Sequence, residues 1–249
     1  MLEQARLIER VREVCRADSD LDAALMYGSF ADGTADEHSD IEFWIFTSVP
    51  ADPRAWIERV SPVTHLVRNE FGAHVAFFPG LIRGEFHFAG VADIPSVRDW
   101  PAGAVVLIVD RRGELARNRP QGVIDRTADV CGRFANWLLL AHHVGRRGEV
   151  LRQRDALAHA QRHLLWMARL AEGRTGHWLT PSRQAEAELS AATVAALSRT
   201  HDEVGAAWQA GRALWLEIDP DAPGELIAEL DRELGRRSPS RPAGPAAPR

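Results

Sequence analysis

The sequence predicts an α/β sheet domain followed by an all-α helical bundle domain. Up to Asp110, short apolar segments rich in β-branched and aromatic residues are separated by turn residues, a pattern typical of strands. From Val123 onward, apolar residues recur with the period of about 3.6 that is typical of helices. The chain has 249 residues, which is enough for two domains. We therefore expect a sheet domain over residues 1–115, a helical domain over residues 120–237, and a Pro-rich disordered tail over residues 238–249.

The first half of the chain is expected to begin with a helix. Apolar residues between Leu2 and Arg16 follow the helical period and give one buried face. The expected elements after it are strand Leu21–Met26, turn and short helix Gly28–His38, strand Ile41–Phe46, helix Pro53–Val60, strands Phe71–Phe78 and Gly84–Phe88, connector Asp93–Trp100 and strand Ala104–Asp110. Because the last strand is continuously apolar, we expect it in the centre of the sheet with both faces covered.

The second half is expected to contain five helices, which Gly and Pro residues separate. They are Val123–Arg146, Glu149–Glu172, Arg183–Ser198, Asp202–Ile218 and Glu225–Arg236.

Two carboxylates mark the second expected strand. Asp40 and Glu42 are two residues apart, so on a strand their side chains project to the same face. Neighbouring carboxylates repel each other, and Mg²⁺ between them would relieve that repulsion and complete its coordination with waters and substrate phosphates. Upstream, Gly28 permits close backbone approach and Ser29 offers a hydroxyl, a combination that suits phosphate. The alternative is a half-exposed hairpin whose wet face carries acidic residues.

Two longer strings resemble a known family. Gly-Ser followed by Asp-x-Glu is similar to the signature of the DNA polymerase β-like nucleotidyltransferases. The string from Met26 to Phe43 (MYGSFADGTADEHSDIEF) resembles the lincosamide nucleotidyltransferases that inactivate antibiotics, and so does Leu81 to Phe88 (LIRGEFHF). The resemblance covers the chain from about Met1 to Leu234. It implies a mixed-sheet nucleotidyltransferase domain and a helical acceptor-binding domain.

The resemblance also assigns roles to residues. Asp40 and Glu42 are expected to act in catalysis by holding Mg²⁺, and Gly28 and Ser29 are expected to bind ATP. The third acidic position of the family lies on the strand beside the Asp/Glu strand, and Glu85 matches it. A carboxylate there can take the proton of an acceptor hydroxyl that attacks the α-phosphate. The implied activity is Mg-dependent transfer of AMP from ATP to a lincosamide hydroxyl, with release of pyrophosphate. The other interpretation of Glu85 is a solvent-facing residue on an edge strand.

Composition restricts the class of protein. The hydrophobic content of 45% and charged content of 26% are ordinary for a globular protein, and the net charge of −5 is unlike that of a nucleic-acid-binding protein. No apolar run is long enough to span a membrane, and the N-terminus lacks a signal-peptide pattern. We therefore expect a cytoplasmic protein whose partners are a nucleoside triphosphate and a small antibiotic, with neither nucleic acid nor membrane. The resemblance also implies that the protein forms a homodimer.

Residue usage gives two further expectations. Cys15 and Cys131 have neither metal nor redox spacing and are expected to be buried thiols. All 30 basic residues are arginine, so a lysine-based mechanism is excluded.

Other functions remain open from the sequence alone. The acceptor could be an aminoglycoside or a protein side chain, or the fold could serve as a non-catalytic, antitoxin-like module. His159 and His163 have metal-ligand spacing on a helix, but the intervening residues lack the Glu of a metalloprotease helix. Arg154 with His159 matches the Arg-x-x-x-x-His pattern of RNA-cleaving toxins, which is short enough to arise by chance. Arg83 and His87 lie close to Glu85 in the sequence. The sequence leaves open whether each of them contacts the nucleotide or is an ordinary polar residue.

Overall fold

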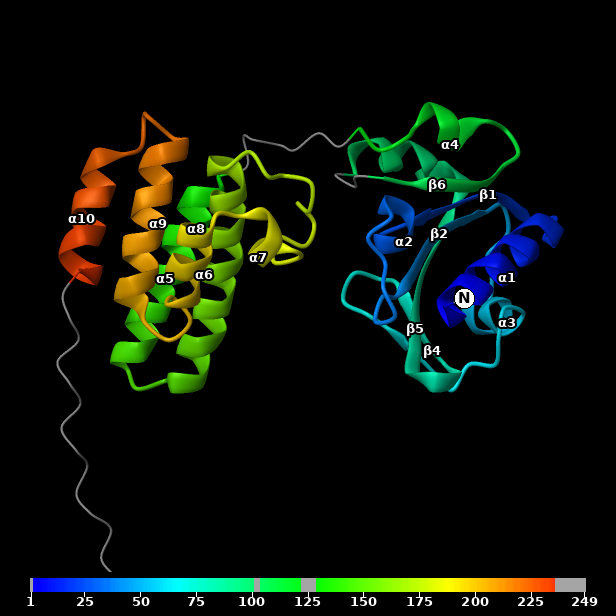
Figure 1. The fold of residues 1–249 in the computed structure, drawn as a ribbon, viewed down its shortest axis with the longest axis horizontal. Helices are drawn as coiled ribbons and strands as arrows, with labels where there is room; N and C mark the ends of the chain where they lie inside the picture. Colours follow the sequence, from blue (N-terminus) through cyan, green and yellow to red (C-terminus); the bar gives the residue numbers. More distant parts are fainter. Residues whose placement is uncertain (1, 101–103, 122–128, 236–249) are drawn as a thin grey trace, which may run out of the picture. The chain divides into compact units, whose positions relative to one another are not determined.

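The computed structural model describes residues 2–100, 104–121 and 129–235. The chain divides into two compact units, Met1–Ile124 and Asp125–Arg249 (Figure 1). Over the described residues, the first unit is a mixed sheet with helices and the second unit is entirely helical, so the predicted fold class is confirmed. The tail predicted over residues 238–249 lies outside the described residues.

The first unit is built on a six-stranded sheet with the order β3-β4-β5-β2-β1-β6. Its strands are β1 (Leu21–Tyr27), β2 (Ile41–Thr47), β3 (His65–Arg68), β4 (His74–Phe78), β5 (Ile82–Gly90) and β6 (Val106–Asp110). Strands β2 and β5 are parallel, and the other neighbouring pairs are antiparallel. Its helical segments are α1 (Glu3–Ala17), α2 (Ser29–Asp32), α3 (Pro53–Glu58) and α4 (Glu114–Arg117), with the 3₁₀ segments η1 (Pro79–Leu81) and η2 (Val91–Asp99).

The two faces of this sheet are covered differently. On one face, Phe43 and Phe86 pack with apolar residues of α1 and α3 in a buried core, and Figure 1 shows these two helices beside the sheet. On the other face, Leu25 and Phe46 form a smaller core with Ile94 of η2. Because side chains alternate along a strand, the residues between the buried positions of the larger core project to this second face.

Three expectations for the first unit are wrong or incomplete. β6 pairs only with β1 among the described strands, so it is an edge strand and not a central one. Its apolar side chains nevertheless contribute to the cores on both faces, as its composition predicted. The connector expected over Asp93–Trp100 is mostly the 3₁₀ helix η2. Strand β3 was not predicted from pattern, because its four residues are mostly exposed and lack an apolar alternation.

The second unit is a bundle of helices around one core. The helices are α5 (Val130–Arg146), α6 (Val150–Ala171), α7 (Ala185–Glu188), α8 (Ala191–Ser198), α9 (Val204–Ile218) and α10 (Gly224–Leu234). Phe134, Leu164 and Trp208 bring α5, α6 and α9 together in that core. The helix predicted over Arg183–Ser198 is two helices, because Ser190 interrupts it and caps α8 by accepting a hydrogen bond from the Thr193 N–H.

Two smaller observations complete the fold. Cys15 and Cys131 are buried free thiols, as predicted, and burial raises the pKa of each to about 12. Within the described parts of the chain, no helix combines the length and the apolar composition needed to cross a membrane.

Candidate active site

The register between β2 and β5 brings the predicted acidic residues together. Glu42 is paired directly with Glu85, and paired residues of parallel strands face the same side of a sheet. Asp40 immediately precedes β2 and lies two residues from Glu42, so it projects to the same face. Strand β5 is internal to the sheet and the Glu85 side chain is only 21% exposed, so the edge-strand interpretation of Glu85 is wrong. We call Asp40, Glu42 and Glu85 the acidic row.

The turn after β1 lies against the acidic row. Gly28 has a φ of 74°, and a Cβ atom at this position would lie 1.5 Å from Oε2 of Glu42. Glycine is therefore required for two reasons. It adopts this φ without strain, and it leaves room for the carboxylate of Glu42. Ser29 follows at the start of α2 and is buried. Gly28, with Ser29 next to it in the chain, thus lies directly against the acidic row at Glu42.

Neighbouring side chains hold two members of the row. Oδ2 of Asp40 lies 2.8 Å from Nη1 of Arg83. Oε1 of Glu85 accepts a hydrogen bond of 3.2 Å from the Tyr27 hydroxyl and lies 3.3 Å from Nε2 of His87. Within the described residues, the second oxygen of Glu85, Oε2, has no hydrogen-bond partner. The two oxygens of Glu85 are therefore not equivalent.

The pKa values in the row follow from these contacts. Burial raises the pKa of Asp40 above its ordinary value, and the charge of Glu85 adds to the rise. The hydrogen bond with His87 lowers the pKa of Glu85, and the Tyr27 hydroxyl lowers it further, against the effect of burial. Burial and then the nearby carboxylates raise the pKa of Tyr27, so its hydroxyl stays protonated and donates. At neutral pH, Glu85 is thus an ionised carboxylate that can accept a proton.

An aromatic cluster fixes the two partners of Glu85. The ring of Trp100 lies 4.7 Å from that of Tyr27 and 5.3 Å from that of Trp44. The ring of Trp44 lies 5.5 Å from that of His87, its neighbour in the β2–β5 register. Sequence reasoning missed Tyr27, although it stands next to Gly28 in the family-like string, because its contact with Glu85 spans 58 residues of chain.

The acidic row has the chemistry of a site for a hard divalent cation. Asp40, Glu42 and Glu85 present carboxylate oxygens on one face, and these are ligands that Mg²⁺ prefers. The charge of Glu85 helps to raise the pKa of Asp40, which is the repulsion that a cation relieves. As they stand, the described residues contain no group of three His, Cys, Asp or Glu side chains gathered closely enough to hold a metal ion. Asp40 and Glu42 have the right ligand type for such an ion, with the remaining coordination from water and phosphate, but Oδ2 of Asp40 would have to leave its ion pair with Arg83.

The histidines of α6 are engaged with aromatic rings. His159 stacks on Trp137 with a ring distance of 4.2 Å. His163 is buried beside Trp166, and burial lowers the pKa of His163 to about 4. These contacts give no support to the metal-ligand spacing seen in the sequence.

Comparisons with known proteins address the two units separately. The model of the lincosamide nucleotidyltransferase-like, C-terminal domain family matches residues 125–205. This match lies in the second unit, whereas the family-like strings lie in the first, and it confirms the resemblance to lincosamide nucleotidyltransferases. A search of curated proteins gave no match.

Several solved structures are similar to the chain at low identity. An aminoglycoside 6-adenyltransferase from Bacillus subtilis is 10% identical, with 94% of this chain and 97% of that chain covered and a TM-score of 0.37. A nucleotidyltransferase-like protein from Exiguobacterium sibiricum is 17% identical, with 94% and 81% covered and a TM-score of 0.32. A CCA-adding enzyme from Thermotoga maritima, complexed with tRNA, is 12% identical, with 94% and 69% covered and a TM-score of 0.34.

Proposed function

We propose that this chain, whose residues 125–205 match the lincosamide nucleotidyltransferase-like C-terminal domain family, transfers AMP from ATP to a hydroxyl group of a lincosamide antibiotic. The observation that carries the proposal is the acidic row beside Gly28 and Ser29, in which Glu85 is aligned with Glu42. Support comes from two separate parts of the chain, since the site is in the first unit and the family match is in the second.

The residues that bind ATP are proposed to be those around the first turn. Asp40 and Glu42 would hold Mg²⁺, which when bound offsets the negative charge of the triphosphate. Gly28, which carries no side chain, would let the backbone approach the phosphates, and Ser29 would offer its hydroxyl. The charge of these two carboxylates would otherwise repel the phosphates, so ATP binding should depend on a divalent cation.

Glu85 is proposed to accept the proton of the acceptor hydroxyl. Tyr27 and His87 occupy Oε1, so the proton goes to Oε2. The hydroxyl oxygen then forms a bond to the α-phosphorus of ATP, the bond from that phosphorus to the oxygen bridging to the β-phosphate breaks, and pyrophosphate leaves. The products are the adenylylated acceptor, pyrophosphate and a protonated Glu85, which returns its proton to water.

Three further features belong to the same proposal. The helical unit is proposed to supply contacts to the acceptor, because its family model is named for lincosamide nucleotidyltransferases. The homodimer and the cytoplasmic location expected from the sequence stay predictions.

A mass-spectrometric screen tests this function. The full chain is incubated with ATP, Mg²⁺ and a panel of lincosamides, aminoglycosides and proteins, and each acceptor is examined for the added mass of AMP. Addition to lincomycin or clindamycin, lost when a chelator is present and lost in Glu42→Gln, supports the proposal. Addition only to an aminoglycoside or a protein would support AMP transfer but contradict a lincosamide as the acceptor. Absence of transfer to every acceptor, with ATP left intact, would favour the non-catalytic module.

A further inference from the structure

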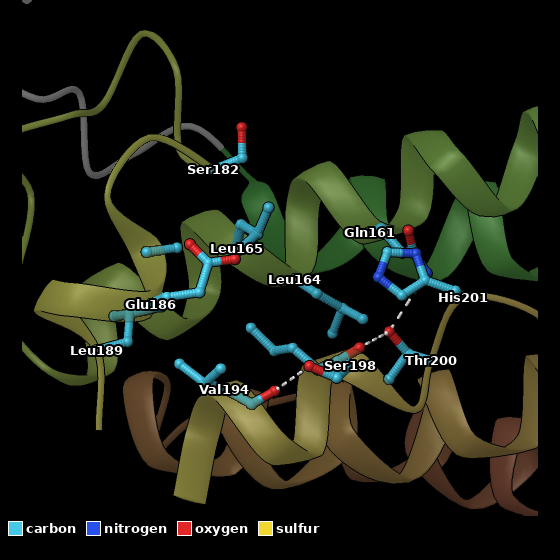
Figure 2. Close-up of a pocket in the computed structure, with 12 residues that line it drawn as sticks. Gln161, Leu164, Leu165, Ser182, Glu186, Leu189, Val194, Ser198, Thr200 and His201 are labelled. Carbon is cyan, nitrogen blue, oxygen red and sulfur yellow. Dashed lines mark hydrogen bonds between the residues drawn. The ribbon is translucent and has the colours of Figure 1, made fainter. Parts of the chain in front are cut away.

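A cavity lies within the second unit, between α6 and the segment that carries α7 and α8 (Figure 2). Its volume is about 160 Å³. Its walls are mainly aliphatic and are formed by Leu164, Leu165, Leu189, Val194 and Leu197. An apolar cavity of about this size is large enough to hold a six-membered ring. The cavity lies on a different unit of the chain from the acidic row.

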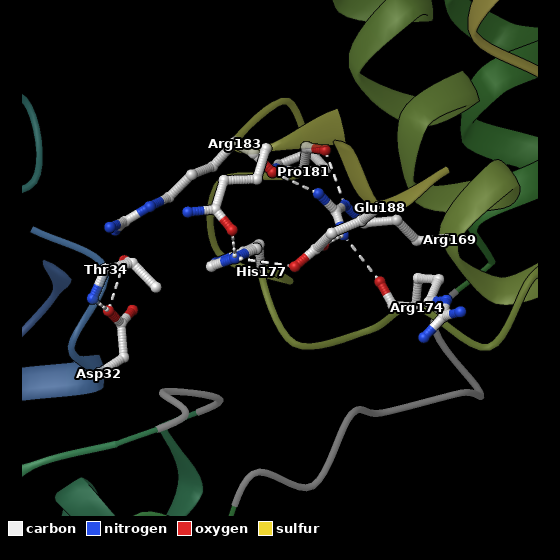
Figure 3. Close-up of polar contacts among 9 residues, drawn as sticks. Asp32, Thr34, Arg169, Arg174, His177, Pro181, Arg183 and Glu188 are labelled. Atoms are coloured by element: carbon white, nitrogen blue, oxygen red, sulfur yellow. Dashed lines mark hydrogen bonds and ion pairs between the residues drawn. The ribbon is translucent and has the colours of Figure 1, made fainter. Parts of the chain in front are cut away.

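Two polar anchors hold the cover of this cavity to α6. Arg169 is fully buried, and its guanidinium donates to the backbone carbonyls of Arg174, Pro181 and Arg183 and to the carboxylate of Glu188 (Figure 3). The distances to the Pro181 carbonyl and to Oε2 of Glu188 are both 2.7 Å. A buried guanidinium with these partners fixes the chain before and within α7.

The second anchor is Glu172, which follows α6. Its carboxylate accepts hydrogen bonds from the N–H and the hydroxyl of Ser190, at 2.8 and 2.9 Å, and from the hydroxyl of Thr193. These contacts pin the start of α8. With α7 and α8 both tied to the end of α6, the cavity is preformed and requires little reorganisation when a ligand enters.

The rim of the cavity carries a carboxylate. Figure 2 shows Glu186 of α7 directed toward Leu165 at one end of the cavity, with His201 and Thr200 at the other end. Glu186 is exposed and forms no ion pair or hydrogen bond within the described residues. At the opposite end, Thr200 is already engaged by the carbonyl of Leu197 and the amide of Gln161. The charge at the rim therefore favours a cationic ligand at the α7 end.

We propose that this cavity binds a small alicyclic amine, with its ring among the aliphatic side chains and its ammonium group at Glu186. The aliphatic walls select a hydrocarbon ring by shape and apolar contact. The carboxylate adds a preference for a positive charge, and its exposure keeps that preference modest and sensitive to salt. This proposal rests on the cavity alone and not on nucleotidyl transfer, so it stands or falls separately from the proposed function.

The test is a methyl-detected NMR titration of the full chain with cyclohexylamine, which is protonated at neutral pH, and with cyclohexanol as its neutral counterpart. We expect both to shift the methyl signals of Leu164 and Val194 in a saturable way. At low salt, the amine should bind roughly two- to fivefold more tightly than the alcohol. Glu186→Gln should remove that preference, whereas Glu217→Gln, a change of an exposed glutamate on α9, should preserve it. Val194→Phe, which fills the cavity, should abolish binding of both compounds.

Three results would overturn the proposal. The first is the absence of saturable shifts at the cavity methyl groups of the folded wild-type chain. The second is equal affinity for the amine and the alcohol at low salt. The third is Glu186→Gln binding the amine as tightly as the wild type does. Glu186 is exposed, so this variant is expected to fold, and its melting temperature provides the check.

Discussion

Glu85 receives both of its hydrogen-bonding contacts on Oε1, so Oε2 is the atom that we propose as the base. Tyr27 and His87 contact Oε1, and both lower the pKa of Glu85. A general base must be ionised at the working pH and must have a free lone pair directed at its substrate. The contacts on Oε1 favour the first requirement, and Oε2 is the oxygen that we propose for the second, because it has no partner among the described residues.

Tyr27→Phe should therefore shift the pH dependence of transfer. The hydroxyl lowers the pKa of Glu85, so its removal raises that pKa, and the acid limb of the kcat profile moves to higher pH. We also expect kcat at neutral pH to fall by roughly 5- to 10-fold, because the carboxylate loses a contact that holds it in position, with little change in ATP affinity. The measurement is kcat and the ATP dissociation constant across the pH range. An acid limb that stays in place or moves to lower pH would contradict this role.

Asp40→Asn should have opposite effects on activity and on stability. We expect transfer to fall by about 100-fold or more, because a ligand of the metal ion is lost. Since the folded state raises the pKa of Asp40, its ionised form lowers the free energy of unfolding at neutral pH. Loss of the partly exposed pair with Arg83 costs little. The variant should therefore melt at an equal or higher temperature at neutral pH.

The control is the pH dependence of the difference in stability between Asp40→Asn and the wild type. The advantage of Asp40→Asn should shrink as the pH falls through the folded pKa of Asp40 and should vanish once the carboxyl group is protonated in both the folded and unfolded states. Thermal unfolding of both proteins over this range provides the measurement. A lower melting temperature for Asp40→Asn at neutral pH, with the gap closing in acid, would mean that Asp40 stabilises the fold.

At the scale of elements, the turn between β1 and α2 is shaped by the carboxylate of a neighbouring strand. Gly28 and Gly33 flank α2 with positive φ values of 74° and 79°, but their ψ values of −157° and 14° place only Gly33 in the left-handed helical region, whereas Gly28 lies in a region that essentially only glycine adopts. A Cβ at Gly28 would collide with Glu42, whereas a Cβ at Gly33 would have nothing within 4 Å. A substitution at Gly33 therefore reports backbone strain alone, whereas a substitution at Gly28 combines backbone strain with displacement of the carboxylate.

Gly28→Ala and Gly33→Ala are compared on this basis. Gly33→Ala should lose about 1 kcal/mol of stability from its left-handed backbone, and Gly28→Ala should lose more, because its backbone conformation is less accessible to alanine. Only Gly28→Ala should also displace Glu42, so only this variant should lose transfer activity, by about 100-fold or more. Chemical denaturation and the rate of AMP transfer are measured for both variants. Equal activity in the two would show that the position of Glu42 does not control the chemistry.

In the second unit, the buried side chain of Arg169 anchors the segment before α7. Arg169→Lys cannot reproduce the planar set of donors, so the opening free energy of α7 should fall by about 3 kcal/mol. Arg232→Lys is the control, because that side chain is 71% exposed, and it should change the opening free energy by less than about 0.5 kcal/mol. Hydrogen exchange of the α7 amides measures both. Similar exchange rates in the two variants would contradict the anchoring role.

The elements also indicate what can be predicted from the sequence. Residues of α1 repeat with the helical period, and residues Asp40 to Phe43 alternate between polar and apolar. Each pattern results from burial of one face of the element, which is why α1 and β2 were predicted correctly. A continuously apolar strand indicates only that both of its faces are covered and says nothing about its place in the sheet. β6 has both faces covered and nevertheless lies at the edge of the sheet. The 3₁₀ helix η2 contains Pro95 and follows no regular period, so pattern reasoning read it as a connector.

The candidate site was predictable in part for the same reason. The types and spacing of Asp40, Glu42 and Glu85 are local features of the sequence, and their chemistry can be inferred from it. One partner of Glu85, His87, lies two residues away on the same strand, but the other partner depends on the register between strands that are distant in the chain, which no local pattern specifies. Tyr27 is the clearest case, because its pairing with Glu42 and its bond to Glu85 arise only when β1, β2 and β5 assemble.

At the scale of the whole molecule, the candidate site and the family match lie in different units. The first unit holds the acidic row and the second holds the family match, and each has its own buried core. Chemistry that requires a nucleotide site and an acceptor site suits a chain built in this way. The proposed function therefore requires the first unit to perform proton transfer as well as to bind the nucleotide.

The most direct test of that claim compares wild type with Glu85→Gln. The substitution keeps the shape of the side chain but cannot accept a proton. If Glu85 is the general base, the rate of AMP transfer should fall by roughly 10²–10⁴-fold, while the dissociation constant of Mg²⁺-ATP stays within about twofold. An affinity that falls in proportion to the rate would mean that Glu85 binds the metal ion and that the base lies elsewhere. An unchanged rate would contradict the proposed role of the acidic row in catalysis.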